Sequence, residues 1–342
     1  MDADALRPLR LRSHLLAEPA ATVPDVARRL VAVQSQDFAA GRWALGIRTA
    51  GDPTVGDVDR AFDEGLLVRA WTQRGTLHIV EPTAVAGILA VTGERQSRAY
   101  GIDPAVLDRA GRVFRSALDI EGSLTRAAFV DALQRDGVAG SVPVGGRILT
   151  ALSLRGVVAL GPVVPREGGV TREQYLVPLP PAETVGDDPA VDLFLAYLRG
   201  HGPASTADFA WWAGLPAGAT RSVAERAGDR VVRTDDGLLS LPAPARAAVA
   251  PTTIALPAFD EYVISYAERS LAMGAGDRTT IGPTVNGMVR PVILRGGVAV
   301  GTWSLSLALG SSGIPDLTLF DGESDAGVAD ALARVRRFFR RA

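Results

Sequence analysis

The stretch Gly202-Pro-Ala-Ser-Thr-Ala-Asp-Phe-Ala-Trp-Trp-Ala-Gly214 contains the signals that decide the fold. Ser205 or Thr206 can cap the first turn of a helix, and the glycine that closes the stretch can end it. A second helix is expected over residues 217–227, and an Asp-Gly pair within residues 230–241 predicts a β-hairpin. Two short helices followed by a hairpin are typical of a winged helix.

The same pattern occurs twice more, closer to the N-terminus. The first copy comprises two helices and two strands, expected from Thr22 and over residues 56–65, 67–72 and 75–80. The second copy comprises a helix capped by Thr125, a further helix and two strands, expected over residues 144–154, 156–161 and 173–179. Three copies in order predict three tandem winged helices.

After residue 251 the pattern changes to mostly strand. Strands are expected over residues 253–256, 289–294 and 298–309, with a closing helix over 325–341. The chain is therefore predicted to be α+β, with three tandem winged-helix domains and a C-terminal β-rich region. The predicted boundaries are 1–120 for the first winged helix with its connecting helices, 121–182 for the second, 183–250 for the third and 251–342 for the C-terminal region.

Three features of the composition narrow the chemistry. The chain of 342 residues has no Cys, which excludes disulfides, thiolate nucleophiles and iron–sulfur clusters. All 36 basic residues are Arg, which excludes a Walker lysine and a lysine Schiff base. The three His residues (His14, His78 and His201) lie far apart without metal-ligand spacing, so we expect no metal and no cofactor.

The expected location is the cytoplasm. The sequence has no apolar run of about 18 residues that would predict a membrane span, and its acidic start lacks the apolar core of a signal peptide. The net charge of −2 excludes a uniformly basic surface. Arginines that gather on one face could still bind phosphates in bidentate fashion.

An unusual polar string, Val33-Gln-Ser-Gln-Asp37, is expected at the end of the first helix of the first copy. On a helix, Gln34 and Gln36 would lie about 200° apart and face opposite ways. They converge only if the chain leaves helical geometry, which the small Ser35 and the cap-forming Asp37 would allow. Ordinary polar residues at a helix end are the alternative interpretation.

Three parts of the sequence together resemble one family. They are Ala32-Val-Gln-Ser-Gln-Asp-Phe-Ala-Ala-Gly-Arg-Trp-Ala-Leu-Gly46 with Thr72-Gln-Arg-Gly-Thr-Leu-His-Ile-Val80, Leu256-Pro-Ala-Phe-Asp-Glu-Tyr-Val-Ile-Ser-Tyr-Ala-Glu-Arg-Ser270, and Asn286-Gly-Met-Val-Arg-Pro-Val-Ile-Leu-Arg-Gly-Gly-Val-Ala-Val-Gly-Thr-Trp303. Over roughly residues 9–340 the chain resembles the AlkZ/YcaQ superfamily of winged-helix DNA glycosylases.

The resemblance implies that the winged helices and the C-terminal region form a C-shaped clamp on duplex DNA. It also implies a catalytic Gln-x-Gln motif, which here is Gln34-Ser35-Gln36 and is typical of the AlkZ-like branch. The middle position is usually apolar in that family. The implied substrates are N7-alkylated purines in double-stranded DNA, including bulky adducts and interstrand crosslinks, and the implied role extends to self-resistance against a genotoxic natural product.

Two amides suit this chemistry. Hydrolysis of an N-glycosidic bond passes through an oxocarbenium-like state. An N7-alkylated guanine already carries positive charge, so the protein has mainly to place a water and stabilise the sugar cation. A Gln carbonyl can hold the water and its NH₂ can donate, and positioning with electrostatics contributes roughly 3–10 kcal/mol. Because the chain has no lysine, we expect a monofunctional enzyme that leaves an abasic site.

Contact with DNA is expected from arginines and helix N-termini. The candidate arginines, each of which could equally form an ion pair within the fold, are Arg42, Arg74, Arg269, Arg290 and Arg295. The hairpin over residues 290–301 is expected to enter a groove near the lesion. His78 and Asp37 are candidate near-site residues, for which a structural histidine and a helix cap are the favoured roles.

The competing hypothesis is a non-catalytic winged-helix protein that binds lesions or acts as a regulator. The presence of both Gln34 and Gln36 favours the enzyme. So does the number of winged helices, since a typical regulator has one together with a dimerisation or ligand domain. We expect a monomer that acts on DNA in the nucleoid without any membrane association.

Overall fold

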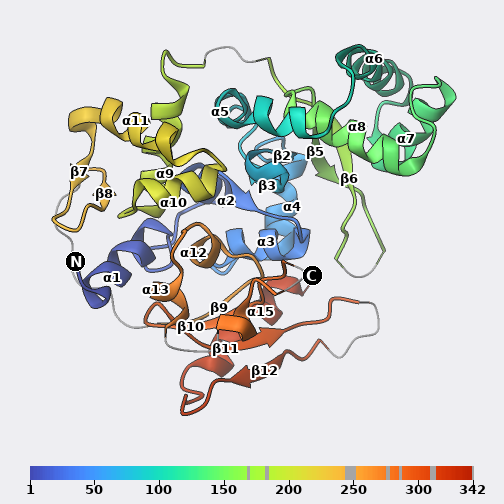
Figure 1. Ribbon diagram of the computed structural model, residues 1–342. Coiled ribbons are helices and arrows are strands. Elements are labelled where there is room, and N and C mark those ends of the chain that lie inside the picture. The colour runs from blue at the N-terminus through green and yellow to red at the C-terminus, as the bar shows by residue number, and fades with distance from the viewer. Residues whose placement is uncertain are drawn as a thin grey trace.

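The computed structural model describes residues 1–167, 170–181, 185–242, 252–274, 278–284, 287–308 and 313–340. Its elements form an α+β fold, as predicted from the sequence (Figure 1). Asn286, the first residue of the third family-like stretch, and the predicted boundary near residue 250 lie outside the described residues. No helix in the described ranges is both long and apolar enough to cross a membrane.

The N-terminal part contains α1 (Ala3–Ser13), α2 (Val23–Leu30), β1 (Val33–Gln34), α3 (Phe38–Gly46), α4 (Val55–Asp63), β2 (Val68–Trp71) and β3 (Leu77–Val80). The predicted helix from Thr22 is confirmed, because the Thr22 side chain accepts a hydrogen bond from the backbone N–H of Asp25. That helix ends at Leu30, so the polar string does not lie at a helix end as expected. The polar string instead lies on an extended segment that begins with β1.

The next part contains α5 (Ala84–Ala99), α6 (Pro104–Glu121), β4 (Leu124–Thr125), α7 (Arg126–Arg135), α8 (Val142–Leu154), β5 (Val158–Val163) and β6 (Gln174–Pro178). Thr125 caps α7 as predicted, by accepting a hydrogen bond from the N–H of Ala128. For α5 and α6, the sequence predicts nothing more specific than connecting helices within residues 1–120. Both bury only part of their surface against the sheet and α8.

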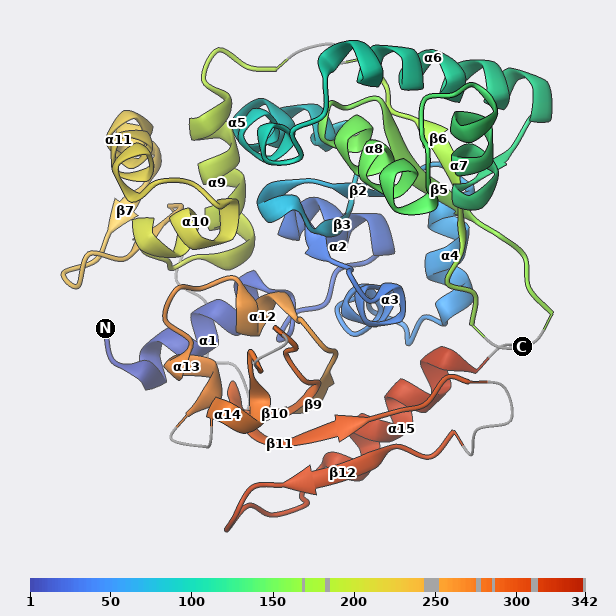
Figure 2. The same cartoon turned by 45° about the vertical axis from the view of Figure 1, so that its right-hand side comes forward.

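The strands of these two parts join in one antiparallel sheet of six strands, in the order β1-β3-β2-β5-β6-β4. The link between the two hairpins is the β2–β5 pairing, in which Arg69 lies opposite Leu160. The sheet therefore crosses the predicted boundary between residues 120 and 121. Helices α5 to α8 surround the half of the sheet that contains β5 and β6 (Figure 2).

The third part contains α9 (Pro189–His201), α10 (Thr206–Ala213), α11 (Ala217–Ala227), β7 (Val232–Arg233) and β8 (Leu239–Ser240). Ser205, not Thr206, caps α10 through a capping box with Asp208. Gly214 ends the helix in the left-handed conformation, with φ of 68°, where a side chain would be strained. The predicted helix pair and hairpin are thus confirmed.

The C-terminal part contains β9 (Thr253–Leu256), α12 (Glu261–Ile264), α13 (Ser270–Met273), α14 (Arg278–Ile281), β10 (Val292–Arg295), β11 (Val298–Ser304), β12 (Asp316–Leu319) and α15 (Val328–Phe339). Its four strands form an antiparallel sheet in the order β12-β11-β10-β9. Trp43 of α3 ties this sheet to the N-terminal part, because its indole N–H donates to the carbonyl of Ala255 at 2.7 Å. Figure 2 shows the sheet beneath α1 and α3.

Three groups of buried apolar side chains meet around β1. Val33 belongs to the group that α2, α3 and α4 share with the C-terminal sheet. The preceding Ala32 belongs to the group that is centred on α9 and α10. Leu77, at the start of the paired strand β3, belongs to the group formed by α6, α7 and α8. The polar string therefore lies where all parts of the chain converge.

Candidate active site

The two amides of the polar string lie on an extended segment. Gln34 pairs with His78 of β3, and the ladder continues through Ser35, whose N–H donates to the carbonyl of Leu77 at 2.8 Å. Alternate side chains of an extended chain point to the same side, so Gln34 and Gln36 share one side. Ser35 faces the other side and is 1% exposed. The helical geometry that would have separated the amides is absent from this segment.

Both amide oxygens are held by the turn between β2 and β3. The Arg74 guanidinium donates to Oε1 of Gln34 at 2.9 Å, and the N–H of Leu77 donates to Oε1 of Gln36 at 3.2 Å. A carbonyl oxygen has two lone pairs, so each can accept one more hydrogen bond. The Gln34 side chain is half-buried, whereas that of Gln36 is exposed. The site can therefore present two oriented amides to a bound molecule.

Arg74 is the residue that fixes Gln34. Its backbone has a φ of 57° within the short turn η1 (Gln73–Gly75), a conformation that residues other than glycine rarely adopt. Its guanidinium also donates to the carbonyl of Trp212 in α10. Burial, partly offset by the charge of Glu261, lowers the pKa of Arg74. This arginine was predicted to contact DNA; in the structure its bonds orient the amide.

Glu261 lies directly behind the amide strand, and the sequence analysis did not single it out. This carboxylate is 1% exposed, and its Oε1 accepts a hydrogen bond from the backbone N–H of Gln34 at 2.7 Å. Its Oε2 accepts from the Ser265 hydroxyl and lies 3.7 Å from Nε2 of His201. Burial alone would raise the pKa of Glu261, but His201, His78 and Arg74 together lower it to about 2. The site therefore contains a buried negative charge at neutral pH.

Two histidines that are distant in sequence, His78 and His201, act on this carboxylate, and the third, His14, packs against His201. His14 and His201 stack edge to face with their ring centroids 4.9 Å apart. His78 is completely buried, with Nδ1 2.8 Å from the Thr72 hydroxyl. Burial, together with the charge of the nearby Arg74, lowers the pKa of His78 to about 3. His78 is thus near the site, as predicted, but it is neutral at physiological pH and cannot supply a proton there.

Asp37 has the predicted capping role. Its carboxylate accepts hydrogen bonds from the N–H groups of Ala39 and Ala40, at 2.9 and 3.2 Å, and so begins α3. The following turn packs tightly on the motif. A Cβ placed on Gly41 would lie 2.6 Å from Cβ of Ser35, so only glycine fits without a shift. This contact sets the depth of the strand beneath the two amides.

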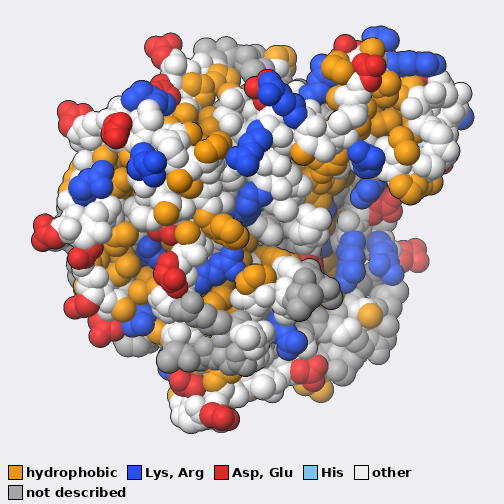
Figure 3. All heavy atoms as spheres, viewed as in Figure 1, with side chains coloured by type: hydrophobic (Ala, Val, Ile, Leu, Met, Phe, Trp, Pro, Cys, Tyr) orange, Lys and Arg blue, Asp and Glu red, His pale blue; other side chains and the backbone are white. Residues whose placement is uncertain are grey.

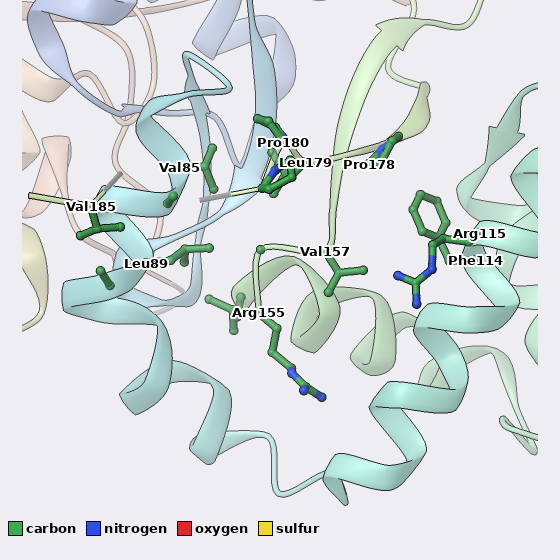
Figure 4. A pocket seen from close by; sticks show the side chains of 15 residues that line it. Val85, Leu89, Phe114, Arg115, Arg155, Val157, Pro178, Leu179, Pro180 and Val185 are labelled. Atoms are coloured by element: carbon green, nitrogen blue, oxygen red, sulfur yellow. The ribbon is translucent and has the colours of Figure 1, made fainter. Parts of the chain in front are cut away.

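A cavity of about 780 Å³ opens beside Gln36. Its wall combines apolar side chains with arginines, carboxylates and amides, and it includes Trp71, Leu77, Val130, Arg69, Arg126, Arg172, Asp131, Glu173 and Gln174. A second cavity, of about 590 Å³, lies between α5, α6 and the segment after β6 (Figure 4). Its lining is mostly apolar and includes none of the predicted site residues. The first cavity is therefore the one that belongs to the amide site.

A family model described as DNA glycosylase AlkZ-like matches residues 27–338 of the chain. The chain belongs to the AlkZ-like family of DNA glycosylases. The interstrand DNA cross-link repair glycosylase of Streptomyces sahachiroi is 26% identical over 312 residues, which are 82% of this chain and 81% of that protein. The structure of the Streptomyces sahachiroi DNA glycosylase AlkZ has the same fold, with a TM-score of 0.76 at 23% identity, and the match covers 98% of this chain and 96% of that one.

The family membership confirms the resemblance drawn from the sequence. This AlkZ-like glycosylase has both amides, Arg74 and Glu261 within the matched range. In the described ranges, no group of three or more His, Asp or Glu side chains could hold a metal ion.

Of the predicted DNA contacts of this glycosylase, Arg42 is wrong as a surface ligand, and Arg295 forms an ion pair within the fold. Arg42 is completely buried, with its guanidinium 2.6 Å from the Asp59 carboxylate and above the Phe38 ring. It holds α3 to α4 and cannot reach a phosphate from there. Arg295 bonds Glu323 at 3.1 Å and the carbonyl of Ser324 at 2.6 Å, so it holds the segment before α15. Both form the ion pairs that were the stated alternative.

The other two arginines keep the exposure that a DNA contact needs. Arg290 is exposed at the start of β10. Arg269 is half-exposed, with its guanidinium 5.0 Å from the Trp211 ring, and burial lowers its pKa. Its charge also lowers the pKa of Arg74, which places it close to the amide site. In Figure 3, basic side chains are spread across the middle of the viewed face, whereas most acidic ones lie around its rim.

Proposed function

We propose that this protein is a monofunctional DNA glycosylase that hydrolyses the N-glycosidic bond of N7-alkylated purines in duplex DNA. The observation that carries the proposal is the pair of neutral amides, Gln34 and Gln36, oriented by hydrogen bonds to their carbonyl oxygens. Neither amide can protonate a leaving base at neutral pH. The substrate must therefore bring a leaving group that is already activated, and an N7-alkylated purine is positively charged.

The amides serve to place the attacking water. Each Oε1 has one lone pair engaged by the protein, and the second lone pair with the NH₂ group can bind a water beside the sugar. The negative charge of Glu261, behind the backbone of Gln34, favours a sugar that develops positive charge. Arg74 opposes part of that effect, and its main contribution is to fix the Gln34 side chain.

The wider arrangement supports an extended version of the proposal. We propose that the three helix-pair and hairpin units act as winged helices of a C-shaped clamp, with the boundaries predicted above. The relative from Streptomyces sahachiroi is named for cross-link repair, and this supports bulky and crosslinked purines as substrates. We further propose a monomer that works on DNA in the cytoplasm and protects its host against a genotoxic natural product.

The test is base release from a duplex that contains one N7-methylguanine, detected by alkaline cleavage of the abasic product. Wild type should release the base, and Gln34→Ala and Gln36→Ala should each slow single-turnover release by about 100-fold or more. Gln134→Ala, on the exposed side of α7, is the matched control and should behave as wild type. Thermal unfolding of all variants separates loss of the amide from loss of the fold.

The same assay tests the alternatives. Without alkali the strand should stay intact, because a monofunctional enzyme forms no Schiff base. Strand cleavage without alkali, together with a trapped covalent complex after reduction, would contradict this part of the proposal. If wild type binds the damaged duplex tightly but releases no base, the protein is a lesion-binding or regulatory protein and not an enzyme.

A further inference from the structure

One buried arginine differs from all the others that the structure describes. Arg10, Arg42, Arg48 and Arg69 are each less than 9% exposed. In the first three, the guanidinium lies 3.7 Å from Asp208, 2.6 Å from Asp59 and 2.7 Å from Asp260, respectively. Within the described ranges, Arg69 has no carboxylate within 4.0 Å. A buried charge without a counter-charge is unfavourable, so this exception needs a physical reason.

All the acceptors that Arg69 uses in the structure are neutral. Its Nε donates to the carbonyl of Ser35 at 2.9 Å, its Nη2 to the carbonyl of Gln36 at 3.3 Å and its Nη1 to Oε1 of Gln174 at 3.4 Å. Burial, together with the charges of Arg42 and Arg126, lowers the pKa of Arg69 to about 10, against an opposing effect of Asp37. Positive charge is thus in excess around this guanidinium.

The guanidinium faces the cavity of about 780 Å³ beside Gln36. Two exposed arginines, Arg126 and Arg172, line the same cavity. Arg126 and Ala127 begin α7, so the N-terminal end of that ten-residue helix, which favours anions, also borders the cavity. Two exposed carboxylates, Asp131 and Glu173, share the wall; among the described residues neither forms an ion pair with these arginines.

We propose that this cavity is a phosphate subsite, which takes a phosphodiester of the damaged strand next to the lesion nucleotide. Arg69 binds it from the interior, and Arg126 with Arg172 binds it from the mouth. A phosphodiester supplies the missing negative charge, and its oxygens match a guanidinium in bidentate geometry. Because Arg69 also holds the carbonyls of Ser35 and Gln36, the bound phosphate sets the distance from the sugar to the amides.

This inference rests on the proposed function, and its test uses wild-type protein first. Duplexes that contain N7-methylguanine are prepared with one neutral methylphosphonate at each phosphate around the lesion in turn. One position should weaken binding by about tenfold, as expected for a lost charge-assisted contact. If no position near the lesion weakens binding of the wild type, the subsite does not exist.

Variants then connect that position to the cavity. Arg69→Met should weaken binding of the all-phosphate duplex by about tenfold and reduce the slope of log affinity against log salt by about one. With the sensitive methylphosphonate, this variant should show no further loss, whereas Arg112→Gln, an exposed arginine of α6 outside the cavity, should keep the full tenfold loss. Independent losses, which multiply to about a hundredfold, would overturn the proposal.

Two additional arms keep the test valid if Arg69→Met does not fold. Arg126→Gln and Arg172→Gln alter exposed side chains and should each remove part of the methylphosphonate effect. Unchanged methylphosphonate effects in both variants would contradict the assignment of these residues. Binding without base release by wild type would refute the proposed function alone, since the phosphate arms are measured by affinity.

Discussion

Replacement of Glu261 by Gln should destabilise the fold by about 3 kcal/mol at pH 7. Gln has nearly the same shape and can still accept the hydrogen bond from the N–H of Gln34, so the substitution removes the charge and the acceptor for the Ser265 hydroxyl. The pKa of Glu261 falls from its ordinary 4.5 to about 2, and the difference of about 2.5 corresponds to about 3 kcal/mol in favour of the ionised folded state. The hydrogen bond and charge of His201 are the largest causes of this lowering, and the charge of Arg74 adds to them.

The sign of this effect gives a second measurement. A lowered carboxyl pKa stabilises the fold above pH 4.5, and the contribution is lost as the pH falls toward 2. Denaturant unfolding of both proteins should therefore show a constant difference from pH 7 to about 5 and a smaller one at pH 3.5. Glu225→Gln, at an exposed position of α11, should stay within about 0.5 kcal/mol of wild type. A Glu261→Gln protein as stable as wild type at pH 7 would refute the reasoning.

Three other predictions concern the packing and protonation of the same region. Ser35→Ala should leave stability unchanged or raise it by about 1 kcal/mol in denaturant unfolding, because the buried Ser35 hydroxyl has no hydrogen-bond partner among the described residues. Gly41→Ala should lower stability by about 1–3 kcal/mol and slow base release, since its Cβ would overlap Ser35. Gly87→Ala in α5, where a Cβ meets nothing within 4 Å, should instead raise stability by up to about 1 kcal/mol, and equal effects of the two changes would contradict this account. The folded His78 stays neutral down to about pH 3 while the unfolded one takes a proton below 6.5, so this residue should lower stability by about 2 kcal/mol between pH 7 and 5, in addition to the effect of the buried His14, whose pKa is also lowered. That slope should flatten in His78→Gln, and an equally steep slope in the variant would show that other groups control it.

Local signals in the sequence were sufficient where the structure depends on neighbours in the chain. Thr125 and Ser205 cap the helices that follow them, because a cap needs only the next three residues. The Asp37 cap is of the same kind. The placement of Gln34 on a strand could not be predicted in this way. Its strand has two residues, and its partner His78 is 44 positions away.

The ion pairs of the arginines could not be predicted from the sequence either, because their partners are distant in the chain. Arg42 and Arg69 both follow apolar runs, and nothing adjacent in sequence separates a residue paired with a carboxylate from one that lacks it. The Asp59 that neutralises Arg42 is supplied by a different helix. Glu261 lies within a family-like stretch, but its environment depends on His78 and His201, which only the folded chain brings to it. The position of this buried acid behind Gln34 is therefore apparent only in the folded structure.

The six strands from β1 to β4 form one sheet, which connects the strand that carries the two amides to the second helix pair. A duplex that lies against α7 and α8 therefore meets the amides at a fixed separation. Because one sheet connects the two parts, we expect the scissile bond to reach the amides through deformation of the DNA. Adducts that unstack or kink their neighbours make that deformation easier, whereas an intact stretch of B-form DNA resists it. A protein surface that deforms little would thus favour damaged duplexes that bend easily over intact ones.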